Sequence, residues 1–378
     1  MPNTANSPRA RDLGIPLDGT PGAFNAITDV EGVLVGHTTL IEGDGALEVG
    51  RGPVRTGVTV VMPRGRRYDP VFAASHALNG NGEMTGTIWI EESGFLEGPI
   101  AITNTHSVGV VRDAIIAWEI KNQVYDPVAP GIFWSLPVVA ETYDGILNDV
   151  NGFHVRSEHV FAALDSAAGG QVAEGAVGGG TGMICHGFKG GIGTASRQLS
   201  DEAGGFTVGA LVQANYGARR YFTVAGVPVG RELAELPIET HNNATPPPGT
   251  GSIIIIVATD APLLPHQLKR LTRRIPLGIG RVGGMGENTS GDIFMAFSTA
   301  NPGAAKRHTT VELQMLSNES LNPLFEATIQ ATEEAILNAL VAAKTTIGVN
   351  GNTAHALPHE RLREILRKYG RLNEALSP

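Results

Sequence analysis

The sequence predicts an α/β (α+β) protein folded as a single domain of 378 residues. Short runs rich in Val and Ile, typical of strands, alternate with stretches of helical periodicity along the chain. Hydrophobic residues make up 42% of the chain, enough for a large core, and no repeat of about 20–50 residues is visible. The 49 glycines follow no period and stand between apolar runs, which indicates tight turns between closely packed layers.

The chain before residue 237 is expected to begin with an arm and to contain several strands and a helix. The arm is predicted at residues 1–22, which are polar and rich in Pro and Gly. Apolar, β-branched runs predict strands at 33–35, 58–62, 100–104 and 206–214. A helix is predicted over 110–121, because one of its faces carries Val111, Ala114, Ile115 and Trp118.

The chain from residue 237 onward predicts a loop, a strand and three helices. Residues 237–251 have loop composition, and three successive prolines there exclude a helix or a central strand. A strand follows at 252–257. Helices are expected from Pro265, over 323–344 and over 360–369. The first should bury Leu268, Leu271 and Ile275 and expose Lys269, Arg270 and Arg273, while the second should be capped by Asn322 and bury a stripe of Phe325, Ile329, Ile336 and Leu340.

Charge and cysteine content exclude several classes of protein. The net charge is −9 and no block rich in Lys or Arg is present, so we expect no nucleic-acid partner. The lone cysteine, Cys185, excludes an internal disulfide and a thiolate zinc cluster. No apolar run approaches the ~20 residues that span a bilayer, and the N-terminus does not resemble a signal peptide. We therefore expect no membrane partner and a cytoplasmic location, or a periplasmic one if a signal peptide was removed.

Several common catalytic motifs are absent. The sequence contains no GxSxG, no HExxH and no CxxC. The glycine-rich stretch 178–193 lacks the Gly-Lys-Ser/Thr ending of a phosphate loop, and we interpret it as turns between packed strands. His106, His186 and His266 have no carboxylate or second histidine at ligand spacing, so we assign them structural roles. We expect neither a metal nor a cofactor.

The junction between the proline-rich loop and the following strand carries possible chemistry. Glycine has no Cβ, so the peptide bond between Gly251 and Ser252 can be strained and closely approached. The Ser252 hydroxyl could attack the preceding carbonyl, and hydrolysis would leave Ser252 as a new N-terminus. Its α-amine, with an ordinary pKa of ~7.7–8.0, could then act as a base. By itself, Gly-Ser before a strand is more typical of a plain turn.

The junction segment GTGSIIIIVATDAPLLPHQLKRL resembles the corresponding segment of the DmpA-like aminopeptidases. This family comprises L-aminopeptidase/D-amino-acid esterases and β-peptidyl aminopeptidases. The resemblance runs nearly end to end through ordered motifs at 25–30, 79–86, 102–106, 137–145, 179–183, 212–215 and 288–294. It implies a four-layer α/β/β/α sandwich like that of the N-terminal-nucleophile hydrolases, with different strand connectivity. It also implies self-cleavage into chains 1–251 and 252–378, and a tetramer of such heterodimers.

The resemblance assigns roles residue by residue. Ser252 matches the nucleophile, Ser290 the second serine near the free amine, and Asp292 the acid that orients Ser290. Asn215 and Tyr143 match the oxyanion stabilisers, and an amide and a phenol are suitable donors for a developing negative oxygen. The residues that match the pocket for the free amino group of the substrate are Glu141 and Trp134. A carboxylate there would pair with an ammonium group and so select unblocked N-termini.

The sequence therefore predicts an aminopeptidase that acts on small peptides, amides and esters. Asp292 stands where some β-peptide-cleaving relatives carry Glu, so α- and β-amino acid substrates both stay open. One alternative is a self-cleaving acyltransferase like the ornithine acetyltransferases, which use a threonine nucleophile, since Thr250 lies two residues before Ser252. Another is a binding protein that never cleaves itself.

Overall fold

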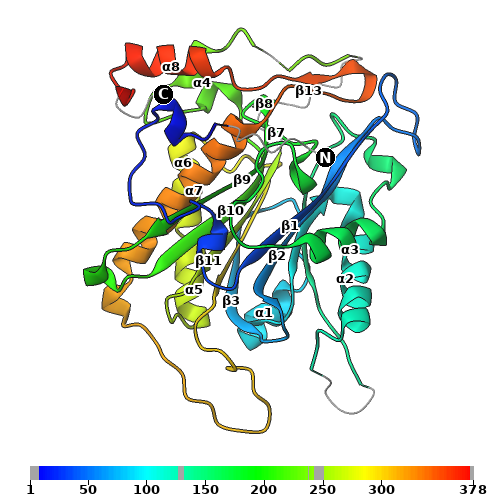
Figure 1. Ribbon diagram of the computed structural model, residues 1–378. Coiled ribbons are helices and arrows are strands. Elements are labelled where there is room, and N and C mark those ends of the chain that lie inside the picture. The colour runs from blue at the N-terminus through cyan, green and yellow to red at the C-terminus, as the bar shows by residue number, and fades with distance from the viewer. Residues whose placement is uncertain (1–7, 127–131, 237, 242–250, 375–378) are drawn as a thin grey trace.

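The computed structural model describes residues 8–126, 132–236, 238–241 and 251–374. Two β-sheets pack face to face between two outer layers of helices, as Figure 1 shows. The smaller sheet has the order β1-β2-β5-β6, with strands Leu34–Glu42, Val54–Arg66, Ile100–Asn104 and Val138–Thr142. The larger has the order β4-β3-β12-β11-β10-β9, with strands Phe95–Leu96, Val71–Gly80, Gly291–Ser298, Ser252–Thr259, Thr207–Asn215 and Gly191–Gln198. The expected four-layer α/β class is confirmed.

Helices cover the outer face of each sheet. On the larger sheet lie α5 (Pro265–Thr272), α6 (Ile275–Val282) and α7 (Asn322–Ala342), whereas α2 (Val108–Asn122) and α3 (Ser157–Ser166) pack on the smaller one. The remaining elements are short or peripheral: α1 (Thr87–Ser93), α4 (Val229–Glu232), α8 (His359–Lys368), and the ribbons β7–β8 (Ile184–Cys185, Phe188–Lys189) and β13–β14 (Thr346–Ile347, Thr353–Ala354).

Strand β11 shows how the sequence places a strand in the centre of the fold. All eight of its residues are buried, and its run of apolar side chains serves both faces of the larger sheet. Ile253, Ile255 and Val257 pack toward the helices, whereas Ile254 and Ile256 pack toward the smaller sheet. Because side chains alternate along a strand, Ser252 points to the same side as Ile254, between the two sheets.

Most predicted elements are confirmed, with differences at their ends. The predicted apolar face of α2 is buried, and α5 begins at Pro265 as expected. Ile275 is buried but opens α6, since the helix from Pro265 ends at Thr272. The predicted loop 237–251 lies mostly outside the described residues, as does Thr250.

Three sequence-based expectations were wrong in detail. Asn322 is the first helical residue of α7, and no side chain caps that helix. Helix α7 buries nearly its whole circumference, because it lies on β9 and β10 and is itself covered by α6, so a single stripe underestimates its core. The N-terminal segment is no free arm after residue 8: Ala10 and Ile15 are buried, and Arg11 forms an ion pair with Glu334 of α7.

The two sheets are linked by side-chain hydrogen bonds at one end. The Gln213 side chain of β10 donates from Nε2 to the carbonyl oxygen of Thr103 (3.0 Å) and to the hydroxyl of Thr142 (2.8 Å). Those acceptors stand at the ends of the parallel pair β5 and β6. Strand ends from both sheets therefore meet here, and the loops that follow them surround the start of β11. Within the described residues, no helix combines the length and apolar content needed to cross a membrane.

Candidate active site

Ser252 begins β11 at the end where Gln213 links the two sheets, and it is buried, with 6% of its surface exposed. Asn215, the last residue of β10, pairs with it in antiparallel register, and Gly291, the first residue of β12, pairs with it in parallel register. The backbone N–H of Gly291 donates to Ser252 Oγ (3.2 Å) and to the carbonyl oxygen of Gly251 (3.3 Å). One donor thus contacts both the hydroxyl and the carbonyl of the predicted cleavage bond.

Gly251 occupies a position that a larger residue would not fit. Its φ of +150° lies in a region that L-residues with a side chain rarely adopt. A Cβ on Gly251 would stand 2.0 Å from the carbonyl oxygen of Asn215, which is backbone and cannot move aside cheaply. The glycine before Ser252 is therefore required by the close approach of β10.

The side chain of Asn215 is held at both ends by backbone groups. Its Oδ1 accepts from the N–H of Ile184 (2.8 Å), and its Nδ2 donates to the carbonyl oxygen of Tyr143 (2.9 Å). These partners determine which end of the amide is which. One Nδ2 hydrogen is used by Tyr143, and paired residues of an antiparallel ladder point to the same face. The Asn215 amide therefore lies on the same face of the sheet as the Ser252 side chain and has a second hydrogen to donate.

Tyr143 contributes its backbone to the site more clearly than its hydroxyl. Tyr143 is 47% exposed as a residue, and its Oη stands 2.3 Å from where a Cβ on Gly145 would lie. The ring therefore folds over Gly145. The oxyanion role of the Tyr143 hydroxyl stays a prediction.

Ser290 and Asp292 form a buried pair beside the backbone of β11. Ser290 Oγ donates to Asp292 Oδ1 (2.6 Å), and Asp292 pairs in register with Ile253, the residue after Ser252. Burial raises the pKa of Asp292 to about 6, and the charge of Glu287 adds to this, while the hydrogen bonds from Ser290 and from the backbone of Ile253 lower it. The site thus contains a carboxyl group that gains or loses a proton near neutral pH.

Glu141, near the end of β6, is buried and held by two donors. Its Oε1 accepts from the N–H of Glu83 (3.0 Å), and its Oε2 accepts from the hydroxyl of Thr105 (2.5 Å). Burial raises the pKa of its carboxyl group. A Cβ on Gly82 would lie 3.3 Å from Glu141 Oε1 and 3.1 Å from the Cα of Gly291, so Glu141 and the start of β12 flank the same glycine.

Trp134 is placed less closely than the other predicted residues. It precedes β6 outside any helix or strand and is 58% exposed. The structure thus brings Ser252, Asn215, Ser290, Asp292 and Glu141 to one end of the sheets, together with the backbone of Tyr143, whereas Trp134 stays a predicted rim residue.

Sequence reasoning missed two contributors to the site and one buried lysine that donates to the Met183–Ile184 peptide unit, which in turn contacts Asn215. The N–H of Gly291 and the hydroxyl of Thr105 lie inside motifs that were recognised, but their partners come from other strands. Lys189 was interpreted only as a mismatch to a phosphate loop. Its available signal was a lone lysine in the glycine-rich stretch between Glu174 and Asp201, which contains no acidic residue to pair with it.

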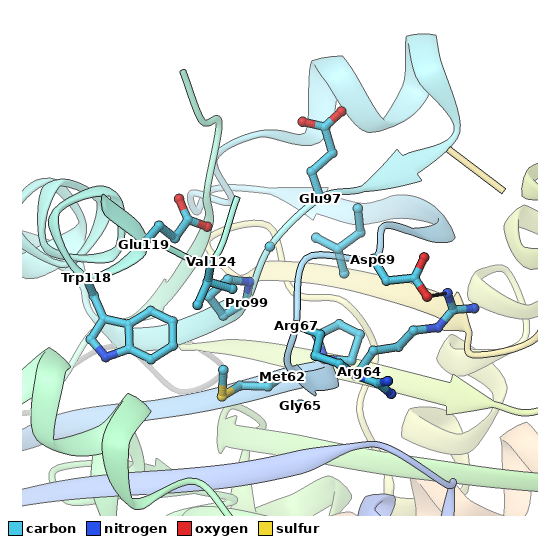
Figure 2. A pocket seen from close by; sticks show the side chains of 13 residues that line it. Met62, Arg64, Gly65, Arg67, Asp69, Glu97, Pro99, Trp118, Glu119 and Val124 are labelled. Atoms are coloured by element: carbon cyan, nitrogen blue, oxygen red, sulfur yellow. Dashed lines mark hydrogen bonds and ion pairs between the residues drawn. The ribbon is translucent and has the colours of Figure 1, made fainter. Parts of the chain in front are cut away.

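A cavity elsewhere in the molecule is lined by another buried carboxyl group, that of Glu119 (Figure 2). It lies beside Met62 and Arg64 at the end of β2. Because β2 runs antiparallel to β5, this end is opposite the one that holds Ser252. Burial raises the pKa of Glu119 there to about 7.

Among the described residues, no group of three or more His, Cys, Asp or Glu side chains could hold a metal ion.

Comparison with known proteins agrees with the fold and with the motifs. The model of peptidase family S58 matches residues 25–354. A β-peptidyl aminopeptidase, BapA of Sphingosinicella microcystinivorans, is 56% identical over 98% of this chain and 95% of its own. The solved L-aminopeptidase D-Ala-esterase/amidase of Ochrobactrum anthropi, described as a variant of the Ntn hydrolase fold, superposes with a TM-score of 0.89 at 48% identity, covering 97% of this chain and 99% of that one. A Burkholderia sp. β-aminopeptidase gives a TM-score of 0.86 at 51% identity, covering 96% and 99%. The chain belongs to peptidase family S58.

Proposed function

We propose that this chain is a serine aminopeptidase that activates itself by cutting the bond between Gly251 and Ser252. The cut produces a chain of residues 1–251 and a chain of residues 252–378 that begins with the nucleophile. Both chains remain in one domain, because β11 and β12 pair with β10 and β3 across the cut. The family match and the relatives support the hydrolase class, and the local geometry supports the position of the cut.

One observation carries the self-cleavage: the N–H of Gly291 contacts both Ser252 Oγ and the carbonyl oxygen of Gly251. When Oγ attacks the Gly251 carbonyl carbon, negative charge develops on that oxygen, and this N–H is aimed at it. The C–N bond then breaks, the hydroxyl proton passes to the Ser252 nitrogen, and an ester remains. Water hydrolyses the ester to the Gly251 carboxylate and restores the Ser252 hydroxyl.

The same residues then act on substrate. Ser252 Oγ attacks the substrate carbonyl while the free α-amine of Ser252 accepts the hydroxyl proton and passes it to the leaving amine. Asn215 Nδ2 and the Gly291 N–H stabilise the oxyanion. Ser290, whose hydroxyl hydrogen is donated to Asp292, accepts a hydrogen bond from the free amine of Ser252. Water then releases the acyl group by the reverse sequence.

Glu141 makes the enzyme an aminopeptidase in this proposal. Its carboxylate, held by Thr105 and Glu83, pairs with the free ammonium group of the substrate, so that blocked N-termini are rejected. The substrates are small unblocked peptides, amides and esters. The relatives include both β-peptidyl aminopeptidases and an L-aminopeptidase D-Ala-esterase/amidase, so substrates with α- and β-amino acids belong in the first screen.

We further propose that processed heterodimers assemble into a tetramer in the cytoplasm. Large apolar side chains are exposed on α1 and on the segment before β6, and Gly86 at the start of α1 adjoins the backbone of Leu136. The exposed residues are Ile88, Trp89, Ile132, Trp134 and Leu136. Light scattering should give four heterodimers per particle, and charged substitutions at Ile88 and Trp89 should dissociate them. A monodisperse monomer in the wild type would contradict this assembly.

The intact masses of the wild type and of Ser252→Ala test the central proposal. We expect two fragments in the wild type, ending at Gly251 and beginning at Ser252, and one full-length chain in the variant. Hydrolysis of aminoacyl p-nitroanilides, but not of their N-acetyl derivatives, should appear only in the wild type. A wild-type chain that stays whole would overturn self-cleavage, and a fragment that begins at Thr250 would favour the acyltransferase mechanism.

A further inference from the structure

Lys189 is a buried cation without a carboxylate partner among the described residues. None of its surface is exposed, and its Nζ donates to the carbonyl oxygens of Gly180 (3.2 Å), Met183 (2.8 Å) and Gly190 (2.8 Å). Three acceptors match the three hydrogens of an ammonium group. Burial lowers the pKa of Lys189 to about 7, whereas an arrangement of carbonyl oxygens alone favours the charged form. Burying a charge is costly unless it is hydrogen-bonded, and these three carbonyl oxygens supply that compensation.

One of these carbonyls leads directly to the candidate oxyanion site. The peptide unit between Met183 and Ile184 accepts from Lys189 at its oxygen and donates at its N–H to Asn215 Oδ1 (2.8 Å). The Asn215 amide in turn donates one Nδ2 hydrogen to the carbonyl oxygen of Tyr143 (2.9 Å), and it has a second Nδ2 hydrogen to donate. Lys189, one peptide unit and the Asn215 side-chain amide therefore form a series of hydrogen bonds, each donated in the same direction, which leads from a positive charge to an amide on the same face of the sheet as Ser252.

Such a series increases the donor strength of its last member. A cation that withdraws electron density from the Met183 oxygen makes the Ile184 N–H a stronger donor, and this polarises the Asn215 amide in the same sense. The surroundings protect the series from water, because Met183 is buried and Ile184 and Asn215 are less than a tenth exposed. Low local polarity preserves such electrostatic effects.

We propose that Lys189 is a positioning and polarising residue for the oxyanion site, acting on Asn215 through the Met183–Ile184 peptide unit. The inference rests on the proposed function, since it requires that Asn215 Nδ2 contact the substrate oxygen. Lys189 itself touches neither substrate nor nucleophile. It aligns Asn215 and strengthens its hydrogen bond most when negative charge develops, so its contribution should appear in kcat rather than in KM.

Three variants separate this role from simple support of the loop. Lys189→Met keeps the length of the side chain and removes the charge and all three hydrogen bonds. Lys189→Gln keeps a hydrogen-bond donor without the charge, and serves if the methionine variant does not fold. Phe188→Leu is the matched control, because Phe188 is equally buried in the same β-ribbon but lies outside the series of hydrogen bonds.

The test combines kinetics with the infrared spectrum of the acyl-enzyme. The probe is an unblocked aminoacyl p-nitrophenyl ester labelled with ¹³C at its carbonyl, and the burst of p-nitrophenol counts active nucleophiles in each variant. Per active site, Lys189→Met should lower kcat by about 10- to 100-fold, less than the ~10²–10³-fold expected when an oxyanion donor is removed outright, with little change in KM. Its ¹³C carbonyl stretch should move to higher frequency, because the carbonyl is less polarised, and Lys189→Gln should move it in the same direction.

Each other outcome rejects a specific idea. A lower kcat with an unchanged carbonyl frequency in both Lys189 variants, or an equal frequency change in Phe188→Leu, would reduce Lys189 to a structural residue. Unchanged kcat in Lys189→Met would overturn the inference while the proposed function stands. Turnover of the ester by Ser252→Ala at the wild-type rate would instead overturn the proposed function itself.

Discussion

Replacing Asp292 with Asn should make the folded protein more stable at neutral pH while it abolishes activity. Asp292 is 2% exposed, and burial raises its pKa to about 6 from the 3.8 of a free aspartate. The folded state therefore holds the proton more tightly than the unfolded state does. The stabilisation by the protonated carboxyl group is complete below pH 3.8 and is lost as the pH rises through 6.

The size of this stabilisation follows from the difference between the pKa of Asp292 in the folded state, about 6, and that of a free aspartate, 3.8. At about 1.4 kcal/mol per pH unit, ionising Asp292 costs the fold about 3 kcal/mol above pH 7 and about half of that at pH 5. Asparagine never ionises, and its Oδ1 can still accept the hydrogen bond from Ser290. The gain of Asp292→Asn over wild type should therefore grow from near zero at pH 4 to about 3 kcal/mol at pH 8.

Urea unfolding at pH 4, 5 and 8 measures this gain. Both proteins should carry Ser252→Ala, so that the same uncut chain is compared in each case. Glu119→Gln provides a matched control at the opposite end of the sheets, because burial raises the pKa of Glu119 to about 7. It should show a similar pH-dependent gain without loss of activity in the Ser252 background. A stability difference for Asp292→Asn that is constant across pH would refute the assignment of a raised pKa.

Three further variants test other parts of the site. Gly251→Ala should remain a single full-length chain by mass, because its Cβ would lie 2.0 Å from the Asn215 carbonyl oxygen. The control Gly280→Ala has open space around its position and should be cut normally. Complete cleavage of Gly251→Ala would contradict the steric argument. Asn215→Ala should lower kcat on aminoacyl p-nitroanilides by about 10²–10³-fold with little change in KM, and an effect confined to KM would exclude an oxyanion role. Glu141→Gln should raise KM for unblocked substrates. Burial raises the pKa of Glu141, so its carboxylate takes up a proton as the pH falls through this raised pKa. The wild-type KM should therefore rise on acidification. The same rise in Glu141→Gln would show that another group is responsible.

Much of this protein can be predicted from local patterns in its sequence. The run of isoleucines after Ser252 predicts a strand buried on both faces, and β11 is such a strand. The apolar face of α2 and the start of α5 at Pro265 follow from helical periodicity and from the geometry of proline. These features depend on residues only a few positions apart, whose spacing the sequence displays directly. The ordered motifs likewise indicate the family, because many matches in register are hard to produce by chance.

The tertiary structure decides everything that depends on pairing between distant segments. Sequence periodicity indicates one buried stripe for α7, but its contact with both a sheet and α6 buries nearly all of it. The Gly291 N–H meets Ser252 only because β12 pairs with β11 in a particular register, across 39 positions of sequence. Lys189 meets Met183 and, through Ile184, the amide of Asn215, because the β7–β8 ribbon folds back on the end of β10. Spacing along the chain determines which residues share a face. Strand register and layer packing determine which faces come into contact, and the chemistry of this site depends on those contacts.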